Sequence, residues 1–291
     1  RADIPLLEAG RGSLHPASLL TFLLGDLYGA GSPHVAYWGP PSSGWTAGGL
    51  ALAQNMTVIY AGALAAVGLV AIGLAAGAAW RREIRFFTVA LGASILYAVG
   101  SYTPVFGWLY EAVPGIHLFR RPADATFIIG IMLAIVGGYG VHVAATEGAP
   151  DARTRNRAGA LVAGLFLAGG SIAVVTGHAG AALRPLLLSG VLVAIAFGVL
   201  LRLKALADLS PRLALAAVTV ITITDLALVN GPNGATGLPP SSYPMLAQPS
   251  REPTIGMLES RIAEAGDTAR RDRVELVGLG FEWPNAGMVH G

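Results

Sequence analysis

The chain lacks cysteine and has few charged residues. It contains no cysteine, which excludes a disulfide, a thiolate nucleophile and a cysteine metal site. Charged residues make up 12% of its 291 residues, about half of the roughly 25% found in soluble domains. Hydrophobic residues reach 54%, and the mean hydropathy is +0.61. This composition excludes an ordinary cytosolic enzyme and a disordered chain, and it predicts a polytopic membrane protein.

The motifs of soluble catalysis are missing as well. No phosphate-cradling glycine loop precedes a lysine, and neither a Gly-x-Ser-x-Gly elbow nor a His-Glu-x-x-His zinc motif occurs. The 19 basic residues nearly balance the 17 acidic ones, so nucleic acid is not an expected partner. No metal site and no cofactor can be identified from these residues. The chain starts at Arg1 without a methionine or a signal peptide. We therefore expect it to be an internal piece of a longer protein.

Six apolar stretches are long enough to cross a bilayer, and they predict an all-α transmembrane bundle over residues 55–230. The expected spans are residues 55–80, 86–103, 125–146, 158–177, 185–203 and 213–230. Small residues within the spans predict close backbone packing between helices. These are Gly62, Ala66, Gly137, Gly138, Gly140, Gly164, Gly169 and Gly170.

The placement of positive charge predicts how the bundle is oriented. Alternate loops carry nine basic residues, namely Arg81, Arg82, Arg85, Arg153, Arg155, Arg157, Arg202, Lys204 and Arg212. The opposite set carries only Arg120, Arg121 and Arg184. Because Lys and Arg in short loops resist translocation, the first set is expected in the cytoplasm. Both flanking segments, 1–54 and 231–291, are then extracytoplasmic.

The two flanking segments differ in character. Residues 14–28 are apolar but too short to span, which favours an interfacial or buried helix on the outer side. Residues 231–253 form a Pro/Gly/Ser-rich linker, and residues 255–265 have helical spacing. Residues 273–277 alternate like a strand. We therefore expect a small α+β extracytoplasmic domain to begin in this tail.

The outer loop between the second and third spans holds most of the candidate binding residues. It concentrates Glu111, His117, Arg120, Arg121 and Asp124 beside the membrane surface. The paired donors of arginine suit phosphate, so Arg120 and Arg121 are candidates to hold the phosphate of a lipid-linked substrate. A structural alternative stays open, in which Asp124 complements the start of the third span and the arginines snorkel among headgroups.

Asp225 lies inside the sixth span. A carboxylate within a membrane is costly and is a site candidate by default. It lies only five residues from Asn230, at about 1.5 Å of rise per residue, so it is not deep in the span. Hydrogen bonds from hydroxyl groups or from the loop arginines would be enough to hold it.

Several outer-face motifs carry a resemblance to a known family. They are Leu24-Gly25-Asp26-Leu27-Tyr28-Gly29, Tyr37-Trp38-Gly39-Pro40, Arg82-Glu83-Ile84-Arg85-Phe86-Phe87, Thr103-Pro104-Val105-Phe106 and Pro114-Gly115-Ile116-His117-Leu118-Phe119-Arg120-Arg121-Pro122-Ala123-Asp124. Over residues 14–230 the chain resembles the later half of bacterial YfhO-like membrane proteins, which are similar to GT-C-class glycosyltransferases.

The resemblance implies an enzyme of the bacterial inner membrane that takes a sugar from a polyprenyl-phosphate carrier at the outer face. Its partners would be this lipid-linked donor and membrane lipids, and a divalent metal is compatible with the chemistry. The family's usual catalytic acid lies in an earlier loop, so no catalytic residue is assigned here. Asp26 lies in a matching motif and is a further binding candidate, with loop capping as the alternative.

Two other functions stay open. A transporter or flippase for a lipid-linked saccharide would line a midplane path with polar or broken helices. A noncatalytic membrane scaffold would hold a protein partner through its outer tail. The sugar, the acceptor and the oligomeric state do not follow from the sequence.

Overall fold

The computed structural model describes residues 4–31, 35–40, 54–119, 121–231 and 253–264. Throughout these ranges the regular secondary structure is helical, and they contain no strand. The chain divides into two units, Arg1–Gly231 and Pro232–Gly291. The second unit contributes helix α9 (Pro253–Glu264), close to the helix predicted at 255–265. The strand predicted at 273–277, on which the α+β domain depends, lies outside the described residues.

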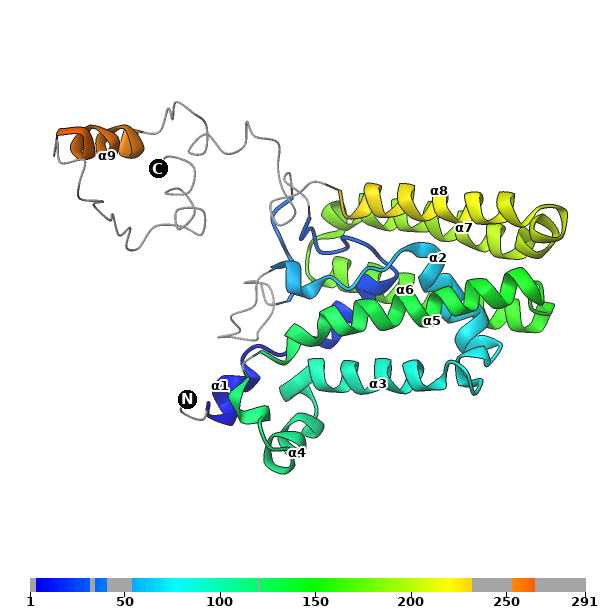
Figure 1. Ribbon diagram of the computed structural model, residues 1–291, viewed down its shortest axis with the longest axis horizontal. Helices are drawn as coiled ribbons and strands as arrows, with labels where there is room; N and C mark the ends of the chain where they lie inside the picture. The colour runs from blue at the N-terminus through cyan, green and yellow to red at the C-terminus, as the bar shows by residue number, and fades with distance from the viewer. Residues whose placement is uncertain (1–3, 32–34, 41–53, 120, 232–252, 265–291) are drawn as a thin grey trace. The chain divides into compact units, whose positions relative to one another are not determined.

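Long apolar helices dominate the first unit. They are α3 (Arg85–Val99), α5 (Thr126–Thr146), α6 (Ala152–Val175), α7 (Ala179–Leu209) and α8 (Pro211–Val229). Among the described residues, the last four of these are long and apolar enough to cross a membrane. A fifth crossing is possible if α3 is counted together with α4 (Pro104–Ala112), to which it is joined by a bend. In Figure 1, α3 lies along one side of α5, and α7 pairs with α8.

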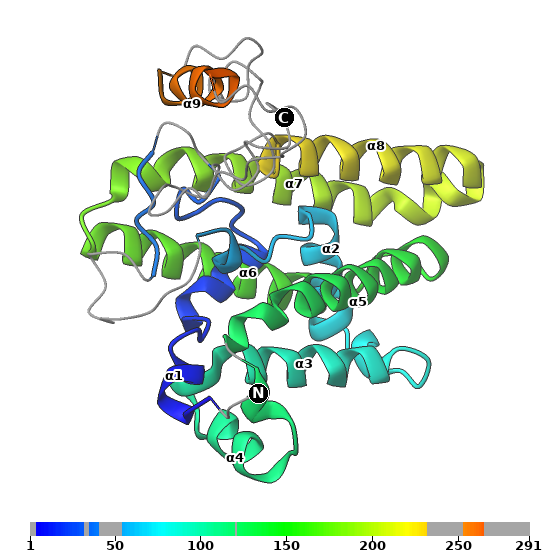
Figure 2. The same cartoon turned by 60° about the vertical axis from the view of Figure 1, so that its left-hand side comes forward.

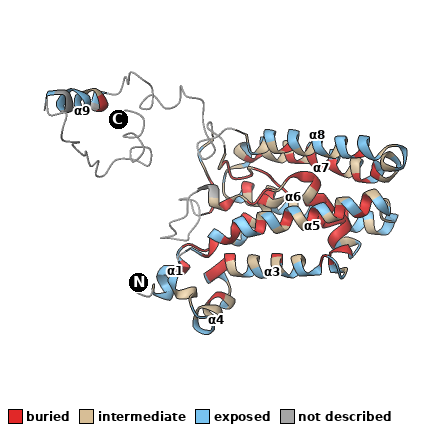
Figure 3. Ribbon diagram, viewed as in Figure 1, coloured by how far each residue is buried: buried red, intermediate tan, exposed pale blue. Residues whose placement is uncertain are grey.

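The exposed surface of these helices is apolar. Only 11% of the most apolar stretch of α8 is buried, and Figure 3 shows the outward faces of α7 and α8 largely exposed. Phe127, Leu167 and Leu215 are each at least 68% exposed. Many exposed large apolar side chains on long helices are a liability in water but are the normal surface of a helix in lipid. The first unit is therefore a helical bundle with the apolar surface of a membrane protein.

The segment predicted as the first span is broken. After η2 (Gln54–Thr57), residues 58–62 are not helical, and a short apolar helix follows at Ala63–Ala75. It consists of α2 (Ala63–Val67) and the wider π-helical η3 (Gly68–Ala75). Thr21 anchors the non-helical stretch, because its hydroxyl oxygen accepts a hydrogen bond from the Ile59 amide at 3.1 Å. The continuous span expected over 55–80 is thus replaced by a half-length helix, followed by η4 (Ala78–Trp80).

Glycines let this half-length helix approach α5 closely. A Cβ atom on Gly137 would overlap the backbone of Ala65, and one on Gly140 would overlap that of Gly68. In contrast, a Cβ on Gly138 would meet nothing within 4 Å, as would one on Gly164 or Gly170. Only some of the small residues predicted to pack closely between helices therefore do so. The rest of that set includes Gly62, Ala66 and Gly169, which lie against other parts of the bundle.

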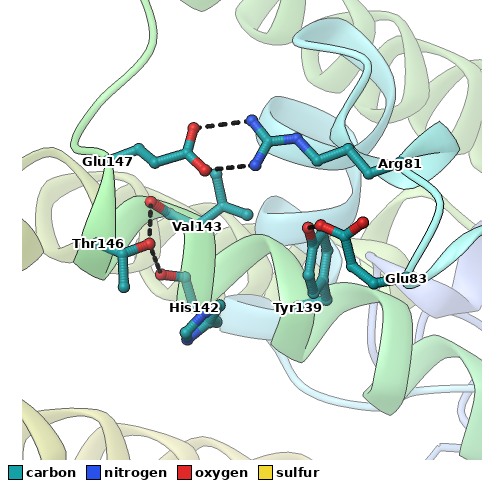
Figure 4. Close-up of polar contacts among 7 residues, drawn as sticks. All are labelled: Arg81, Glu83, Tyr139, His142, Val143, Thr146 and Glu147. Carbon is teal, nitrogen blue, oxygen red and sulfur yellow. Dashed lines mark hydrogen bonds and ion pairs between the residues drawn. The ribbon is translucent and has the colours of Figure 1, made fainter.

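The predicted cytoplasmic loops lie together at one end of the bundle. Arg81 and Glu147 form a two-armed ion pair that joins the loop before α3 to the end of α5 (Figure 4). The hydroxyl of Tyr139 donates a hydrogen bond to Glu83 beside it at 2.5 Å. Arg81 holds the pKa of the Glu147 carboxyl below its ordinary value. The last turns of α7 lie beside them, since a Cβ on Gly148 would lie 3.5 Å from the Lys204 side chain.

The leading segment packs at the opposite end of the bundle. It begins with α1 (Leu6–Gly10), and the apolar stretch 14–28 forms a 3₁₀ helix, η1 (Pro16–Phe22), followed by turns. Leu23, Leu24 and Leu27, in the turns after η1, are fully buried. The stretch 14–28 is thus packed into the bundle, but only its first half is helical, with 3₁₀ geometry. In Figures 1 and 2, α1 and α4 lie near the start of α5, far from the Arg81 end.

Candidate functional site

A sharp elbow shapes the end of the bundle that carries the candidate arginines. Helix α3 passes into η5 (Gly100–Tyr102) at Gly100, whose φ of 56° is readily adopted only by glycine. Thr103 is extended, and Pro104 then occupies the first turn of α4, where its missing amide hydrogen costs nothing. The two helices meet at 103°. As a result, α4 lies across the end of the bundle instead of continuing through it.

The leading segment ties this elbow to the start of α5. Leu14 donates its amide hydrogen to the Ala98 carbonyl at 2.8 Å, and the Ser101 amide donates to the Ser13 hydroxyl oxygen at 2.9 Å. On the other side, the Ala123 amide donates to the Gly12 carbonyl at 2.9 Å. Residues 12–14 therefore hold the end of α3 and the turn at 121–123 together. These hydrogen bonds fix the backbone from which the side chains of the loop between α3 and α5 project.

Arg121 lies in this junction with an unusual backbone. Its φ of 58° and ψ of 83° belong to the left-handed region, which non-glycine residues adopt at a cost. Gly12 packs directly on it, and a Cβ at Gly12 would overlap the Arg121 backbone. η7 (Pro122–Ala125) then begins with Pro122, which leads into α5. Strain of this kind persists only where the surrounding structure enforces it. Here the contact with Gly12 holds the Arg121 backbone in this conformation, which sets the direction in which its side chain leaves the backbone.

The Arg121 side chain lines a groove of about 530 Å³ between α3, α4 and the start of α5. The lining residues are Ala93, Ser94, Tyr97, Leu109, Phe119, Arg121, Asp124, Ala125 and Ile128. Its walls are thus mostly apolar, with one guanidinium and one carboxylate among them. The Arg121 guanidinium makes no ion pair or hydrogen bond with the described residues. We call this surface the Arg121 groove.

The remaining loop candidates lie around the elbow and outside the groove lining. His117, on η6 (Ile116–Leu118), has its ring centroid 6.4 Å from that of Tyr110 in an edge-on arrangement. Its carbonyl accepts a hydrogen bond from the Ile4 amide at 3.1 Å. Glu111 is exposed near the end of α4. Arg120 lies outside the described residues, so its part in a paired arginine site stays a prediction.

Asp26 has the contacts expected of a loop-capping residue. Its φ is 54°, and its carboxylate accepts a hydrogen bond from the Gly31 amide at 2.7 Å. Burial raises the pKa of this carboxyl above its ordinary value, while the Gly31 hydrogen bond and the charge of Arg184 oppose that rise. The structure therefore places Asp26 beside the start of α7 and outside the Arg121 groove. Its contacts match the loop-capping alternative.

Asp225 is 1% exposed and engages the broken first segment. Its carboxylate accepts a hydrogen bond from the Tyr60 hydroxyl at 2.6 Å and another from the Ala63 amide at 2.5 Å. Ala63 is the first residue of α2, so a side chain from α8 caps a helix from a distant part of the chain. Gly62 precedes it with a φ of 100°. Asp225 is thus held by a hydroxyl and a helix terminus, and not by the loop arginines.

Two parts of this arrangement escaped sequence reasoning. Gly12, which orients Arg121, carries no recognisable motif, and its role depends on a contact with a residue more than 100 positions away. Tyr60 lies inside the stretch predicted as the first span, 55–80, and had no predicted role of its own. Its hydroxyl in an otherwise apolar run is the signal that could have paired it with Asp225, because a buried Tyr hydroxyl usually has a hydrogen-bond partner.

No group of three or more potential metal ligands occurs among the described residues. Comparison of the chain with protein-family models, with curated proteins and with solved structures gave no match. The features of this chain that point to a function are therefore the Arg121 groove and the outer-face motifs.

Proposed function

We propose that the protein is a glycosyltransferase-like membrane protein that holds a polyprenyl-phosphate-linked sugar in the Arg121 groove. The supporting observation is the pairing of an apolar wall with a guanidinium that has no partner among the described residues, at one end of a membrane bundle. A polyprenyl phosphate has an apolar isoprenoid chain that ends in a phosphate. The chain suits the apolar wall of the groove, and the phosphate suits the guanidinium. Arginine suits that phosphate because its planar fork can donate two parallel hydrogen bonds.

The groove supplies part of what sugar transfer needs. As the sugar leaves the carrier, negative charge develops on the lipid phosphate, and a guanidinium fixed in advance stabilises it. Asp124 is the carboxylate among the described lining residues, and it is placed to accept hydrogen bonds from sugar hydroxyl groups. Transfer also needs a base to deprotonate the acceptor, and that role stays unassigned.

The proposed topology has six crossings of the bacterial inner membrane. The non-helical residues 58–62 and the helix at 63–75 make up the first, and α3, α5, α6, α7 and α8 make up the others. The excess of positive charge at the Arg81 end favours the cytoplasm for that end. This places the Arg121 groove and both flanking segments outside, where the carrier-linked sugar of our proposal would be met.

Binding of a polyprenyl phosphate by the purified protein tests the proposal. Losing one charge-assisted contact costs about 1.5–3 kcal/mol, so we expect Arg121→Ala to weaken binding by at least about tenfold. Arg184→Ala is the matched control, since Arg184 is a basic residue near the same end that lines no described groove. Arg121→Lys should recover only part of the affinity, because a lysine cannot form the paired contact.

A polyprenol without phosphate is the second control. Wild-type protein should bind it more weakly, and Arg121→Ala should not change its binding. Equal losses from Arg121→Ala and Arg184→Ala would mean that both residues only anchor the bundle to headgroups, and the proposal would be wrong. Failure of the full-length protein to transfer sugar from any polyprenyl-phosphate donor would contradict the enzymatic part separately.

The broken first segment favours a transporter as the second candidate function. In transporters, the N-termini of half-helices near the midplane hold anionic substrate groups. Here α2 begins about halfway along α5, since Ala65 packs on Gly137, but its N-terminus is already occupied by Asp225. The protein's own carboxylate thus fills the place of a substrate anion, which favours the glycosyltransferase-like proposal. Saccharide flux into proteoliposomes would support the transporter.

A further inference from the structure

A second groove lies at the same elbow, and it shares no lining residue with the Arg121 groove. It has a volume of about 440 Å³ and runs between α1, η5 and α4. That volume falls within the roughly 300–1,000 Å³ typical of small-molecule sites. We call it the Arg11 groove.

Apolar side chains form most of its wall. Leu7 is 79% exposed along one side, and Phe106 is 2% exposed at the base. Pro104 and Gly107 complete the α4 side. An exposed leucine beside a hollow of this kind leaves apolar surface that an acyl chain would cover.

One cation lies on this apolar surface. Arg11 is exposed where α1 ends, and its guanidinium makes no ion pair or hydrogen bond within the described part of the chain. The nearby hydroxyl of Ser101 is held by Ser13, at 3.1 Å between the two hydroxyl oxygens. The groove therefore offers one free donor group to an anion.

The groove also lies at one end of the bundle, where helices that cross a membrane would reach the headgroups. α4 turns across the end of the bundle, and exposed Tyr102 and Trp108 lie on this elbow. Aromatic residues of this kind are enriched at the membrane–water interface. A ligand here would have its polar end at headgroup level and its apolar end along α4.

We propose that the Arg11 groove binds an anionic phospholipid, with the phosphate on Arg11 and an acyl chain along Leu7, Pro104 and Gly107. The choice of a phospholipid follows from the charge of Arg11, the apolar wall and the interfacial position. The guanidinium fork is suited to a phosphate oxygen pair. This site is independent of the proposed sugar carrier, because the two grooves have separate linings.

Native mass spectrometry of the purified full chain tests the site, with phosphatidylglycerol and phosphatidylcholine of identical chains as probes. Wild-type protein should prefer phosphatidylglycerol, and Arg11→Gln should reduce that preference by about tenfold, the effect of one charge-assisted contact. Arg184→Gln, which removes a basic residue that lines neither groove, should leave the preference unchanged.

A second variant tests the acyl chain and does not depend on charge. A Cβ on Gly107 would meet nothing within 4 Å, so Gly107→Leu fills the groove without displacing a neighbour. It should reduce binding of both lipids. Gly92→Leu is the matched control, because Gly92 is equally open but lines neither groove.

The proposal is overturned if Arg11→Gln keeps the wild-type lipid preference, or if Gly107→Leu binds as much lipid as Gly92→Leu. It is also overturned if Arg121→Ala abolishes the phosphatidylglycerol preference, since this would indicate one shared site. Binding of a polyprenyl phosphate should be unaffected by Gly107→Leu. The failure of this site and the failure of the proposed function are therefore separate results.

Discussion

At the residue scale, Asp225 shows how a carboxylate can stabilise a membrane bundle. Its two oxygens accept from Tyr60 and from the first amide of α2, so the charge is met by a hydroxyl dipole and a helix N-terminus. Neither partner is a cation. The residue joins α8 to the helix that packs at the centre of the bundle, and its first role is therefore structural.

Replacing Asp225 tests this role. Asp225→Ala leaves two buried donors unsatisfied, at a cost of about 1–3 kcal/mol each, so we expect a large fall in the free energy of unfolding. Tyr60→Phe removes one hydrogen bond and should have a smaller effect. A double-mutant cycle measured by unfolding in detergent should show coupling between the two positions. Thr224→Ala, at the exposed neighbouring residue, is the control, and an equal effect there would contradict the interpretation.

The buried carboxyl of Asp26 predicts that the stability of the fold depends on pH. Because burial raises its folded-state pKa, the ionised form is disfavoured in the fold, and stability should fall as pH rises from near 4 through the raised pKa. Asp26→Asn keeps an acceptor for the Gly31 amide and tolerates the left-handed backbone.

We therefore expect Asp26→Asn to be at least as stable as wild type at pH 7, with the difference vanishing below about pH 4. Thermal unfolding as a function of pH measures this. Glu111→Gln, which removes an exposed carboxylate elsewhere in the bundle, is the control variant. An Asn variant that is less stable at pH 7 would mean that the charge attraction to Arg184 outweighs the cost of burial.

At the element scale, the half-length helix at 63–75 depends on glycines of α5. Gly137→Ala would overlap the backbone of Ala65, whereas Gly138→Ala, one position along, points into open space. Overpacking at such a contact costs about 1–3 kcal/mol. Unfolding in detergent should show Gly137→Ala to be destabilised by that amount and Gly138→Ala to be nearly unchanged. Similar stabilities would indicate that α5 and α2 shift apart without cost.

The elements also show which parts of the fold are local in origin. Helices α5, α6 and α8 overlap most of their predicted spans, because the apolar length that defines each helix lies within one stretch of sequence. Ser210 accepts a hydrogen bond from the Leu213 amide and is followed by Pro211 at the start of α8. Apolar length alone was enough to predict these helices.

The first span could not be predicted in the same way. Its hydropathy is continuous, but its backbone is broken by contacts with distant residues, which satisfy the groups that a helix would otherwise pair. Thr21 accepts from Ile59, and Asp225 accepts from Ala63. The candidate site also has one part that the sequence predicts and one part that it does not. Arg121 and Asp124 could be chosen from their loop, but the Gly12 contact that orients Arg121 is long-range.

At the scale of the whole molecule, the two ends of the bundle differ in charge and in shape. One end holds the Arg81–Glu147 pair and the adjoining basic loops (Figure 4). The other end holds the elbow, and both grooves lie there with one unpartnered arginine each among the described residues. The proposed function of the Arg121 groove therefore depends on which side of the membrane the elbow end occupies.

The cysteine-free sequence makes this orientation directly testable. Ala112→Cys places a thiol at the exposed end of α4, and Ala149→Cys places one in the exposed loop after α5. Since the basic loops should stay in the cytoplasm, a membrane-impermeant maleimide should label Ala112→Cys in intact cells and Ala149→Cys only after permeabilisation. Both substitutions replace an exposed alanine, so they serve as controls for each other. The reverse pattern would place both grooves in the cytoplasm, where the Arg11 groove could still meet an anionic phospholipid but the Arg121 groove could not meet a donor presented at the outer face.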